Sequence, residues 1–259
     1  MSGPSADLPL RSRPTVAITG ASGALGKALL KAWHCRGAEL VALTHGTTML
    51  KLQDEAGEAI PLRQVTWQVG QEEELSPVLE SVDVLVLNHG VNLYGARDSA
   101  AVATSLEVNA LSSWRLLELF AQVAERRSAV ERQGRHRPEV WLNTSEAEIQ
   151  PALSPLYEIS KRLLGQVLSL RALDLAGKPG SGLRLRRLVL GPFRSALNPI
   201  GLMSSDFVAR EILRQADWDL GLIIVTPNPL TYVQMPLTTL SRWLYFRLFS
   251  GRSGARAQP

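Results

Sequence analysis

The stretch that decides the fold is Pro14-Thr-Val-Ala-Ile-Thr-Gly-Ala-Ser-Gly-Ala-Leu-Gly26, in which a short apolar run meets a glycine-rich turn. A run of this length is typical of a buried parallel strand. Apolar side chains then recur at helical spacing from Ala24 to Arg36, and Gly37 ends the helix. A second strand at 39–43 completes a right-handed crossover unit, the building block of parallel sheets.

The rest of the pattern predicts a single Rossmann-like, doubly wound α/β domain with a seven-stranded, mostly parallel sheet and helices on both faces. Alternating apolar residues between Met49 and Trp67 indicate a β-hairpin that runs into the third strand. The residues Arg184, Arg186 and Arg187 indicate that the sixth strand is partly exposed or lies near an edge. Further strands are expected at 82–87, 139–143, 183–190 and 220–225, and helices at 72–79, 99–127, 155–176 and 204–215.

Composition and charge narrow the classes of function. The 259 residues suit one α/β domain, and a formal charge of +4 is too small to indicate a nucleic-acid partner. The basic run Arg126–Arg137 is expected to be a solvated loop. The single cysteine, Cys35, excludes an internal disulfide, fits a reducing compartment and is expected to be buried in the first helix. The sequence shows neither a secretory signal nor a membrane-spanning run, so a cytoplasmic location is expected.

Three glycines, Gly20, Gly23 and Gly26, lie between the first predicted strand and the first predicted helix. Glycines at such a turn let the backbone approach a pyrophosphate, whose charge is met by the N-terminus of the helix. Ser22 offers a hydroxyl to the same phosphates. The sequence therefore predicts a dinucleotide site at this turn.

Tyr157 and Lys161 stand four residues apart in a predicted helix and therefore lie on one face of it. A nearby ammonium favours phenolate, so the pKa of Tyr157 is expected to fall toward neutral pH. A phenol tuned in this way can pass a proton to or from a substrate oxygen. Two surface residues with no catalytic role would show the same spacing. The assignment of a catalytic role therefore depends on other motifs.

Three such motifs are Thr19-Gly-Ala-Ser-Gly-Ala-Leu-Gly26, Asn88-His89-Gly90 and Asn143-Thr144-Ser145. With Tyr157 and Lys161 they give the chain a resemblance to the short-chain dehydrogenase/reductase family from about residue 15 to residue 226. The glycine motif departs from the family's pattern, because Ala24 stands where a second glycine is expected.

A closer resemblance is carried by Asn143–Glu148, Leu190–Phe193 and Leu197–Gly201. These segments are similar to the dehydrogenase half of bacterial, chiefly cyanobacterial, bifunctional sterol desaturase/short-chain dehydrogenase proteins. That resemblance gives a lipid-like substrate weak support.

The family resemblance implies a role for each of four residues. Tyr157 is the acid/base, and Lys161 lowers its pKa and bonds the nicotinamide ribose. Ser145 holds the substrate oxygen. Asn109, inside the long helix, supports a water that links Lys161 to solvent. No metal is expected in this chemistry.

The resemblance also implies the contacts of the dinucleotide. Gln68 borders the adenine, His89 lies on the cofactor side of the sheet, and Ser195 can reach the nicotinamide carboxamide. The apolar segment 196–205 is expected to form a lid over the substrate. The expected cofactor-binding residues are Gly20, Ser22, Gly23, Leu25, Gly26, Thr44, His45, Gln68, Val69, Asn88, His89, Gly90, Tyr157, Lys161, Gly191, Pro192, Phe193 and Ser195.

The end of the second strand, Leu43-Thr44-His45-Gly46, contains no acidic residue. An acid there would bond the 2′-hydroxyl of the adenosine ribose and repel a 2′-phosphate. Thr44, Thr47 and Thr48 can donate to a phosphate, and Lys51 is a possible cation. The sequence therefore favours NADP(H) over NAD(H).

The expected organisation is a flexible leader at 1–13, a dinucleotide-binding short-chain dehydrogenase domain at 14–228 and an apolar C-terminal helix and tail at 229–259. The last part either packs on the body or a subunit neighbour, or touches lipid as an interfacial helix. The second alternative suits the aromatic and basic residues Arg242, Trp243, Tyr245, Phe246, Arg247 and Phe249.

The leading hypothesis is an NADP(H)-dependent oxidoreductase that interconverts a carbonyl and an alcohol on a fairly apolar small molecule. A dehydratase or epimerase could use the same site, and a dinucleotide-binding sensor or scaffold without turnover is the alternative of a different class. A homodimer or homotetramer is expected, formed by pairing of the two long helices. The apolar residues that suggest it, some of which must face the sheet instead, are Leu106, Leu116, Leu117, Leu163, Leu164 and Val167.

Overall fold

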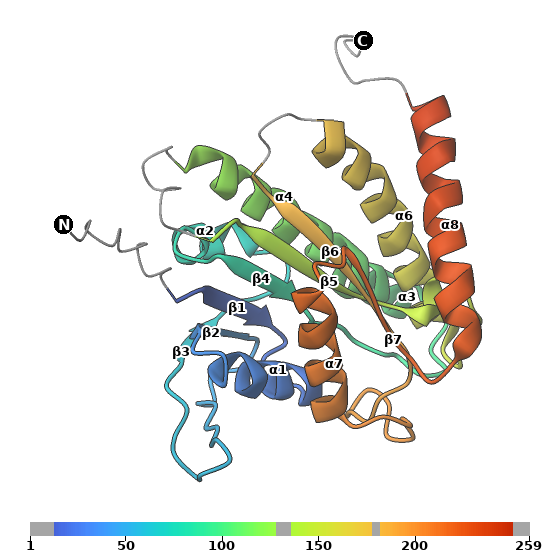
Figure 1. Cartoon of the computed structure of the whole chain (residues 1–259). Coiled ribbons are helices and arrows are strands. Elements are labelled where there is room, and N and C mark those ends of the chain that lie inside the picture. Colours follow the sequence, from blue (N-terminus) through green and yellow to red (C-terminus); the bar gives the residue numbers. More distant parts are fainter. Residues whose placement is uncertain (1–12, 128–135, 178–181, 251–259) are drawn as a thin grey trace, which may run out of the picture.

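Seven parallel strands form one sheet in the order β3-β2-β1-β4-β5-β6-β7 (Figure 1). The computed structural model describes residues 13–127, 136–177 and 182–250, and all statements below concern these residues. The strands are β1 Thr15–Thr19, β2 Glu39–Thr44, β3 Arg63–Thr66, β4 Val84–Leu87, β5 Glu139–Ser145, β6 Arg184–Leu190 and β7 Leu222–Val225. Because every neighbouring pair is parallel, the predicted doubly wound α/β fold is confirmed.

Helices cover both faces of the sheet (Figure 1). They are α1 Ala24–His34, α2 Ser76–Leu79, α3 Ser99–Leu106, α4 Ser112–Arg126, α6 Pro155–Gly177, α7 Ser205–Asp217 and α8 Pro229–Phe249. Side chains from α1 and α7 build the core on one face, and side chains from α4 and α6 build the core on the other. Short 3₁₀ turns at Glu72–Leu75 and Glu146–Glu148 complete the elements.

The connections reverse direction between β1 and β4, the two central neighbours that are distant in sequence. In open parallel sheets, ligands bind beyond the carboxyl ends of the strands at such a reversal. The ends of β1, β4 and β5 therefore mark the edge at which a site is expected.

The predicted hairpin before the third strand is present in reduced form. Gln53 and Ala59 make a single antiparallel bridge, and the turn between them is closed by Asp54. β3 itself runs parallel to β2. The side chain of Gln64 then holds the loop after β2, because its amide donates to the carbonyl of Thr48 at 3.0 Å.

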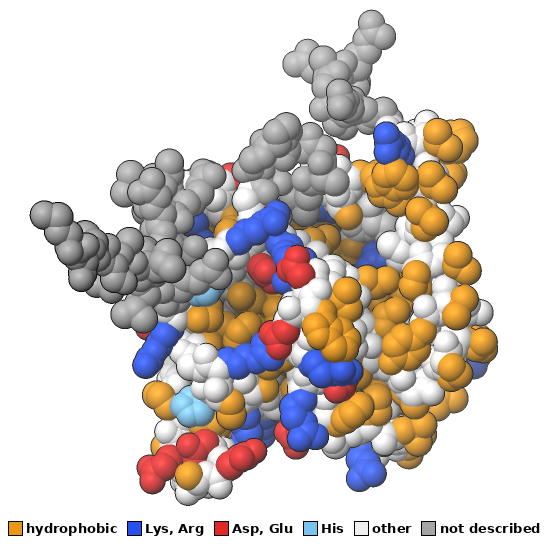
Figure 2. All heavy atoms as spheres, viewed as in Figure 1, with side chains coloured by type: hydrophobic (Ala, Val, Ile, Leu, Met, Phe, Trp, Pro, Cys, Tyr) orange, Lys and Arg blue, Asp and Glu red, His pale blue; other side chains and the backbone are white. Residues whose placement is uncertain are grey.

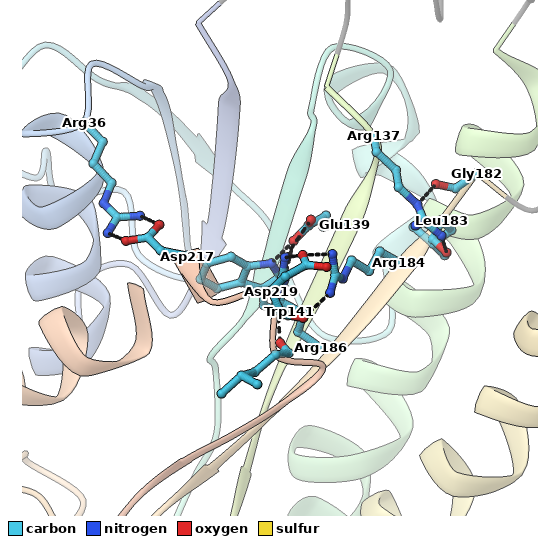
Figure 3. Close-up of polar contacts among 11 residues, drawn as sticks. Arg36, Arg137, Glu139, Trp141, Gly182, Leu183, Arg184, Arg186, Asp217 and Asp219 are labelled. Atoms are coloured by element: carbon cyan, nitrogen blue, oxygen red, sulfur yellow. Dashed lines mark hydrogen bonds and ion pairs between the residues drawn. The ribbon is translucent and has the colours of Figure 1, made fainter. Parts of the chain in front are cut away.

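Of the two alternatives expected for the arginines of β6, the position near an edge is confirmed, because β6 lies beside the edge strand β7. Exposure does not hold for Arg186 and Arg187, which are buried. Arg186 donates to both oxygens of Glu139 at 2.7 and 3.1 Å and to Asp219 at 3.2 Å (Figure 3). Arg184 also pairs with Asp219. Arg187 lies on the other side of the sheet and donates to the backbone of α6. Charged groups can thus occupy a strand beside the edge strand when each is paired.

Another expectation needs correction. Cys35 is exposed at the end of α1 rather than buried. Leu116, Leu117 and Leu164 are the members of the expected interface set that face the sheet, because they lie in the core of the chain itself. The predicted leader, most of the basic loop and the last nine residues lie outside the described residues.

α8 continues through Pro236 and packs along α6 and β7, while a contact of its outward side with lipid stays a prediction. Its buried contacts with the sheet centre on Met235, which meets Val189 and Ile224. None of the described helices is both long and apolar enough to cross a membrane.

Candidate active site

Three predicted residues meet at the carboxyl edge of the sheet, where α6 brings Tyr157 and Lys161 next to Ser145 at the end of β5. The Ser145 hydroxyl is near enough to the Tyr157 phenol to lower its pKa. The Lys161 ammonium lies 5.6 Å from the centroid of the Tyr157 ring and donates to the carbonyl of Asn143 at 3.0 Å. A hydroxyl, a phenol and an ammonium therefore share one small volume.

The pKa of the Tyr157 phenol is raised by burial; the Ser145 hydroxyl opposes the rise, and Tyr94 adds to it. The expected fall in the pKa of Tyr157 is therefore wrong in this structure, because desolvation of the phenol dominates. Burial also lowers the pKa of Lys161 to about 8, against the raising influence of the Glu148 carboxylate. Tyr157 thus begins as a neutral phenol, while Lys161 is poised near physiological pH.

Asn109 is fully buried in a π-helical turn, Glu107–Leu111, between α3 and α4. Its side chain accepts from the N–H of Val91 at 2.8 Å and donates at 3.0 Å to both the Val91 carbonyl and the Ser160 hydroxyl. Such π turns are frequent at functional sites. Asn109 therefore ties the loop after β4 to α6 one residue before Lys161, and its contact with a water remains a prediction.

The glycine turn after β1 has the shape of a phosphate cradle. Gly20 adopts a φ of +61°, in the left-handed region that favours glycine. A Cβ on Gly26 would lie 2.3 Å from the Gly20 carbonyl oxygen, so the turn accepts no larger residue there. Ser22 and Gly23 are exposed, and the first turn of α1 holds no acidic side chain. The side chain of Leu25 is buried in the core, so only its backbone can face a dinucleotide.

Thr19 and His89 join the ends of β1 and β4. The Thr19 hydroxyl accepts from the N–H groups of Asn88 and His89 at 2.9 and 3.2 Å and lies 2.8 Å from the Nδ1 of His89. The Nε2 of His89 has no hydrogen-bond partner among the described residues. Burial, reinforced by the charge of Lys161, lowers the pKa of His89 to about 3. A neutral imidazole suits the expected structural or cofactor-side role better than proton transfer.

Two amide side chains, those of Asn109 and Asn143, contact the loop after β4 at Gly90 and Asn88. A Cβ on Gly90 would lie 3.0 Å from the Asn109 side-chain oxygen, so the loop runs close to that brace. The Asn143 amide donates to the side-chain oxygen of Asn88 at 2.8 Å. The ends of β4 and β5 are therefore locked together beside Lys161.

At the end of β2, Thr44 differs from the expectation that its hydroxyl donates to a phosphate. The buried hydroxyl of Thr44 donates to the Gly46 carbonyl at 2.9 Å and accepts from Gln64 at 3.1 Å, so it already serves the loop itself. Gln68 is exposed and Val69 is half-buried at the same edge, just beyond β3. The exposed polar residues that remain near a ribose site are His45, Thr47, Thr48 and Lys51.

Beyond β6 the segment 191–204 folds back on itself. A Cβ on Gly191 would lie 2.3 Å from the Thr226 hydroxyl oxygen, so the chain must leave the sheet through a glycine. Pro192 accepts from the N–H of Leu202, and Phe193 pairs with Met203. The segment is thus a compact flap beside the site.

Two contacts attach this flap to the loop after β4. The carbonyl of Leu197 accepts hydrogen bonds from the Tyr94 hydroxyl and the Asn92 amide. The segment is therefore attached to the loop that carries Tyr94, whose charge influences Tyr157, and its action as a lid stays a prediction. The Ser195 hydroxyl accepts from the N–H of Asn198 at 3.2 Å, so one of its roles is internal to the flap.

Sequence reasoning missed three residues that shape the site. Asn143 holds Lys161 through its carbonyl, Tyr94 perturbs Tyr157, and Glu148 perturbs Lys161. Asn143 and Glu148 flank Ser145 within one short motif, so that motif could have suggested them. Tyr94 follows Asn88-His89-Gly90 on a loop, and no local sequence pattern predicts that it lies near Tyr157.

Comparison with known proteins agrees with this geometry. The sequence model of the NAD dependent epimerase/dehydratase family matches residues 16–149. The chain is 44% identical over 241 residues to a monoglucosyldiacylglycerol epimerase of Synechocystis sp., an alignment that covers 92% of this chain. The alignment covers only 55% of that relative, so the chain spans about half the length of the protein it matches.

Solved structures share the fold at low identity. A short-chain dehydrogenase from Sphingobium yanoikuyae in complex with NADPH superposes with a TM-score of 0.68 at 17% identity, covering 94% of this chain and 98% of its own. A bulky-bulky ketone specific alcohol dehydrogenase from Comamonas testosteroni gives 0.70 at 17% identity, with 94% and 97% covered. Because the family model covers more than half of the sequence, the chain belongs to the NAD dependent epimerase/dehydratase family, on the fold of the short-chain dehydrogenases.

Proposed function

We propose that the protein is an epimerase that inverts one hydroxyl-bearing carbon of the sugar on a glycolipid. The observation that carries the proposal is the grouping of Tyr157, Ser145 and Lys161 at the end of β5, with the Lys161 ammonium 5.6 Å from the centroid of the Tyr157 ring. It occurs in a chain that shares 44% identity with a monoglucosyldiacylglycerol epimerase along 92% of its length. Inversion by oxidation to a ketone and return to the alcohol requires the groups that these three residues supply.

The residues at the carboxyl edge fit a dinucleotide. Because no side chain fits at Gly20 and Gly26, the backbone of this turn is not covered by side chains. The N-terminus of α1 lies next to the turn and can meet a phosphate. His89 adds a buried ring nitrogen without a partner among the described residues. Bound there, the dinucleotide supplies a hydride acceptor in one half of the reaction and a hydride donor in the other.

The side chains of this protein hold the sugar and move its proton. Ser145 donates to or accepts from the reacting oxygen, and Tyr157 carries the proton between that oxygen and the site. The Lys161 ammonium stabilises the phenolate that forms when Tyr157 gives its proton away. Because burial raises the pKa of Tyr157, the phenol is the resting form, which favours the return of the ketone to the alcohol.

A second candidate is net oxidation or reduction, with the dinucleotide released after each turnover. The observation that favours it is the fold shared with alcohol and ketone dehydrogenases, together with the apolar flap at 196–205. The same flap would suit an apolar carbonyl or alcohol. The two candidates differ in whether the cofactor is consumed.

The experiment is to incubate the protein with monoglucosyldiacylglycerol and dinucleotide in deuterated water and to analyse the sugar by NMR. An epimerase of this kind yields the inverted sugar without deuterium at the inverted carbon, because the same hydride returns, and cofactor absorbance shows no net change. A steady change in absorbance would favour the second candidate. If neither product nor absorbance change appears with sugar lipids or simple carbonyls, a dinucleotide-binding role without turnover would replace both.

The same proposal includes a preference for NADP(H). The end of β2 has no acidic residue to repel a 2′-phosphate, and exposed Thr47, Thr48 and Lys51 can contact one. The Sphingobium relative of this fold was solved with NADPH.

A further inference from the structure

The polarity of α8 is reversed relative to an ordinary surface helix, whose apolar stripe faces the core. The side that contacts the body carries the polar groups Thr231, Thr239 and Arg242 around Met235. The opposite side is apolar and 46% to 74% exposed. We call this side the outer face of α8; its residues are Leu230, Val233, Leu237, Leu240, Leu244 and Leu248.

The inward polar groups fix this orientation. Thr231 is fully buried and donates to the Glu146 carboxylate, which also accepts from Thr226. Arg242 donates to the buried carboxylate of Glu148 at 3.0 Å. Rotating α8 to bury its outer face would break these bonds and take from the buried Glu148 carboxylate its closest cation, which is costly. The helix is therefore held with its apolar side outward.

The outer face is a continuous surface. Figure 2 shows hydrophobic side chains gathered along the side of the molecule where α8 lies. Tyr245 and Phe249 widen the strip near the end of the helix, where Arg247 lies over the ring of Trp243 at 4.9 Å. Aromatic rings and a guanidinium at the margin of an apolar strip suit the boundary between lipid headgroups and acyl chains.

The distribution of charge identifies the kind of surface. From Leu220 to Pro259 the sequence has four arginines and no acidic residue. The remaining residues carry 24 basic and 24 acidic side chains, so this segment supplies the whole formal charge of +4. Of these arginines, Arg242 is paired with Glu148, while Arg247 is exposed. A segment whose charged side chains are all basic complements an anionic bilayer, and Arg247 is its exposed cation among the described residues.

We infer that α8 docks the protein on an anionic lipid surface, with its outer face against the acyl chains. This inference deepens the proposed function, because it rests on a substrate whose lipid part is in that surface. The inward hydrogen bonds of α8 join Thr231 and Arg242 to residues 146–150, directly after Ser145. A helix lying on lipid would therefore also set the orientation of the active site relative to the bilayer.

The test is flotation or sedimentation with phosphatidylglycerol and phosphatidylcholine vesicles, using the full chain. The double variant Leu237→Gln/Leu244→Gln should weaken binding to phosphatidylglycerol by ~100-fold or more, since two leucines that enter the acyl chains on docking are lost. Arg247→Gln should weaken binding about fivefold on anionic vesicles and leave neutral vesicles unchanged. The matched control, Gln234→Ser/Ser241→Gln, changes two exposed polar residues of the same helix and should bind like the unmodified chain.

Three results would overturn the inference: no vesicle binding by the unmodified chain, binding that survives Leu237→Gln/Leu244→Gln, or equal loss in the control. A dimer that dissociates in the double variant while vesicles stay unbound would assign the outer face to a second copy. Epimerisation is measured separately on substrate dispersed in detergent. Vesicle binding without epimerisation there would refute the proposed function alone, and epimerisation without vesicle binding would refute the docking alone.

Discussion

The guanidinium of Arg242 on α8 lies 3.0 Å from the buried carboxylate of Glu148, only three residues beyond Ser145 in the chain. Arg187 approaches the same carboxylate from β6, with 3.8 Å between its Nη1 and the nearer Glu148 oxygen. Glu148 also raises the pKa of Lys161, against the burial that lowers it. One carboxylate therefore connects the C-terminal helix to the electrostatics of the active site.

Replacing Arg242 with Met should lower the free energy of unfolding by about 3 kcal/mol, because the buried Glu148 carboxylate loses its hydrogen-bonded partner and keeps only the more distant Arg187. Denaturant titration measures the change. The control is Arg247→Met, which removes an exposed arginine of the same helix and should have little effect. The double variant Arg242→Met/Glu148→Gln should recover part of the loss, and a double variant no more stable than Arg242→Met would contradict this account.

Glu72 should make the protein sensitive to acid. Burial would raise the pKa of this carboxyl, but hydrogen bonds from Arg115, the Gly70 N–H and Ser112 outweigh it and hold the pKa at about 2. Its ordinary value is 4.5, so the stabilisation is fully present above that pH and is lost as the pH falls toward 2. Because Arg115 is partly exposed and solvent screens the pair, the contribution should be on the order of 2 to 3 kcal/mol.

The measurement is the unfolding free energy of the protein and of Glu72→Gln between pH 7 and pH 2. The two should differ most at neutral pH and converge in acid. A constant difference across that range would show that Glu72 is not the responsible group. Glu73→Gln is the control, since Glu73 neighbours Glu72 and is exposed.

The strand, glycine turn and helix at 14–36 could be predicted from sequence because local spacing specifies them. The meeting of Ser145 with Tyr157 and Lys161 was also predictable, since parallel strands bring their carboxyl ends to one edge. The pKa of Tyr157 was not, because it depends on burial and on Tyr94 from a separate loop. Periodicity contains no information about that approach.

The pairing of the arginines of β6 could not be predicted from the sequence either. Exposure is the ordinary fate of charged residues in a strand, yet Arg186 finds Glu139 on β5 and Asp219 in the loop before β7. Asp219 itself adopts a φ of +62°, which places its carboxylate beside two guanidinium groups. Pairings between residues more than 30 positions apart are set by the tertiary fold, which one sequence does not reveal.

Cofactor preference can be reversed at the end of β2. The protein should bind NADPH at least about tenfold more tightly than NADH, because a bond to a charged phosphate is worth more than one to a hydroxyl. His45→Asp adds an acid beside the ribose site and should favour NADH. Lys51→Gln should weaken NADPH and leave NADH unchanged. Dissociation constants from cofactor fluorescence test all three, and tighter NADH binding by the unmodified protein would refute the preference.

The proton-transfer role of Tyr157 is the most direct test of the chemistry. Tyr157→Phe removes one hydroxyl and keeps the ring, so folding and cofactor affinity should survive. Loss of a positioned acid should slow hydride transfer by ~10²–10⁴-fold. Ser145→Ala should also slow transfer with cofactor affinity unchanged, whereas Lys161→Met should lower both. Single-turnover absorbance of the cofactor separates these outcomes.

The pH dependence supplies the remaining check on Tyr157. Because burial raises the pKa of this phenol, it is protonated near neutral pH, and only its rare phenolate can accept the proton of an alcohol. The rate of alcohol oxidation should therefore rise as the pH increases, while the reduction of a ketone, which uses the phenol, should stay level over the same range. In Tyr157→Phe the rise should disappear. An oxidation rate that climbs with pH in the variant as it does in the unmodified protein would move the proton-transfer role to another residue.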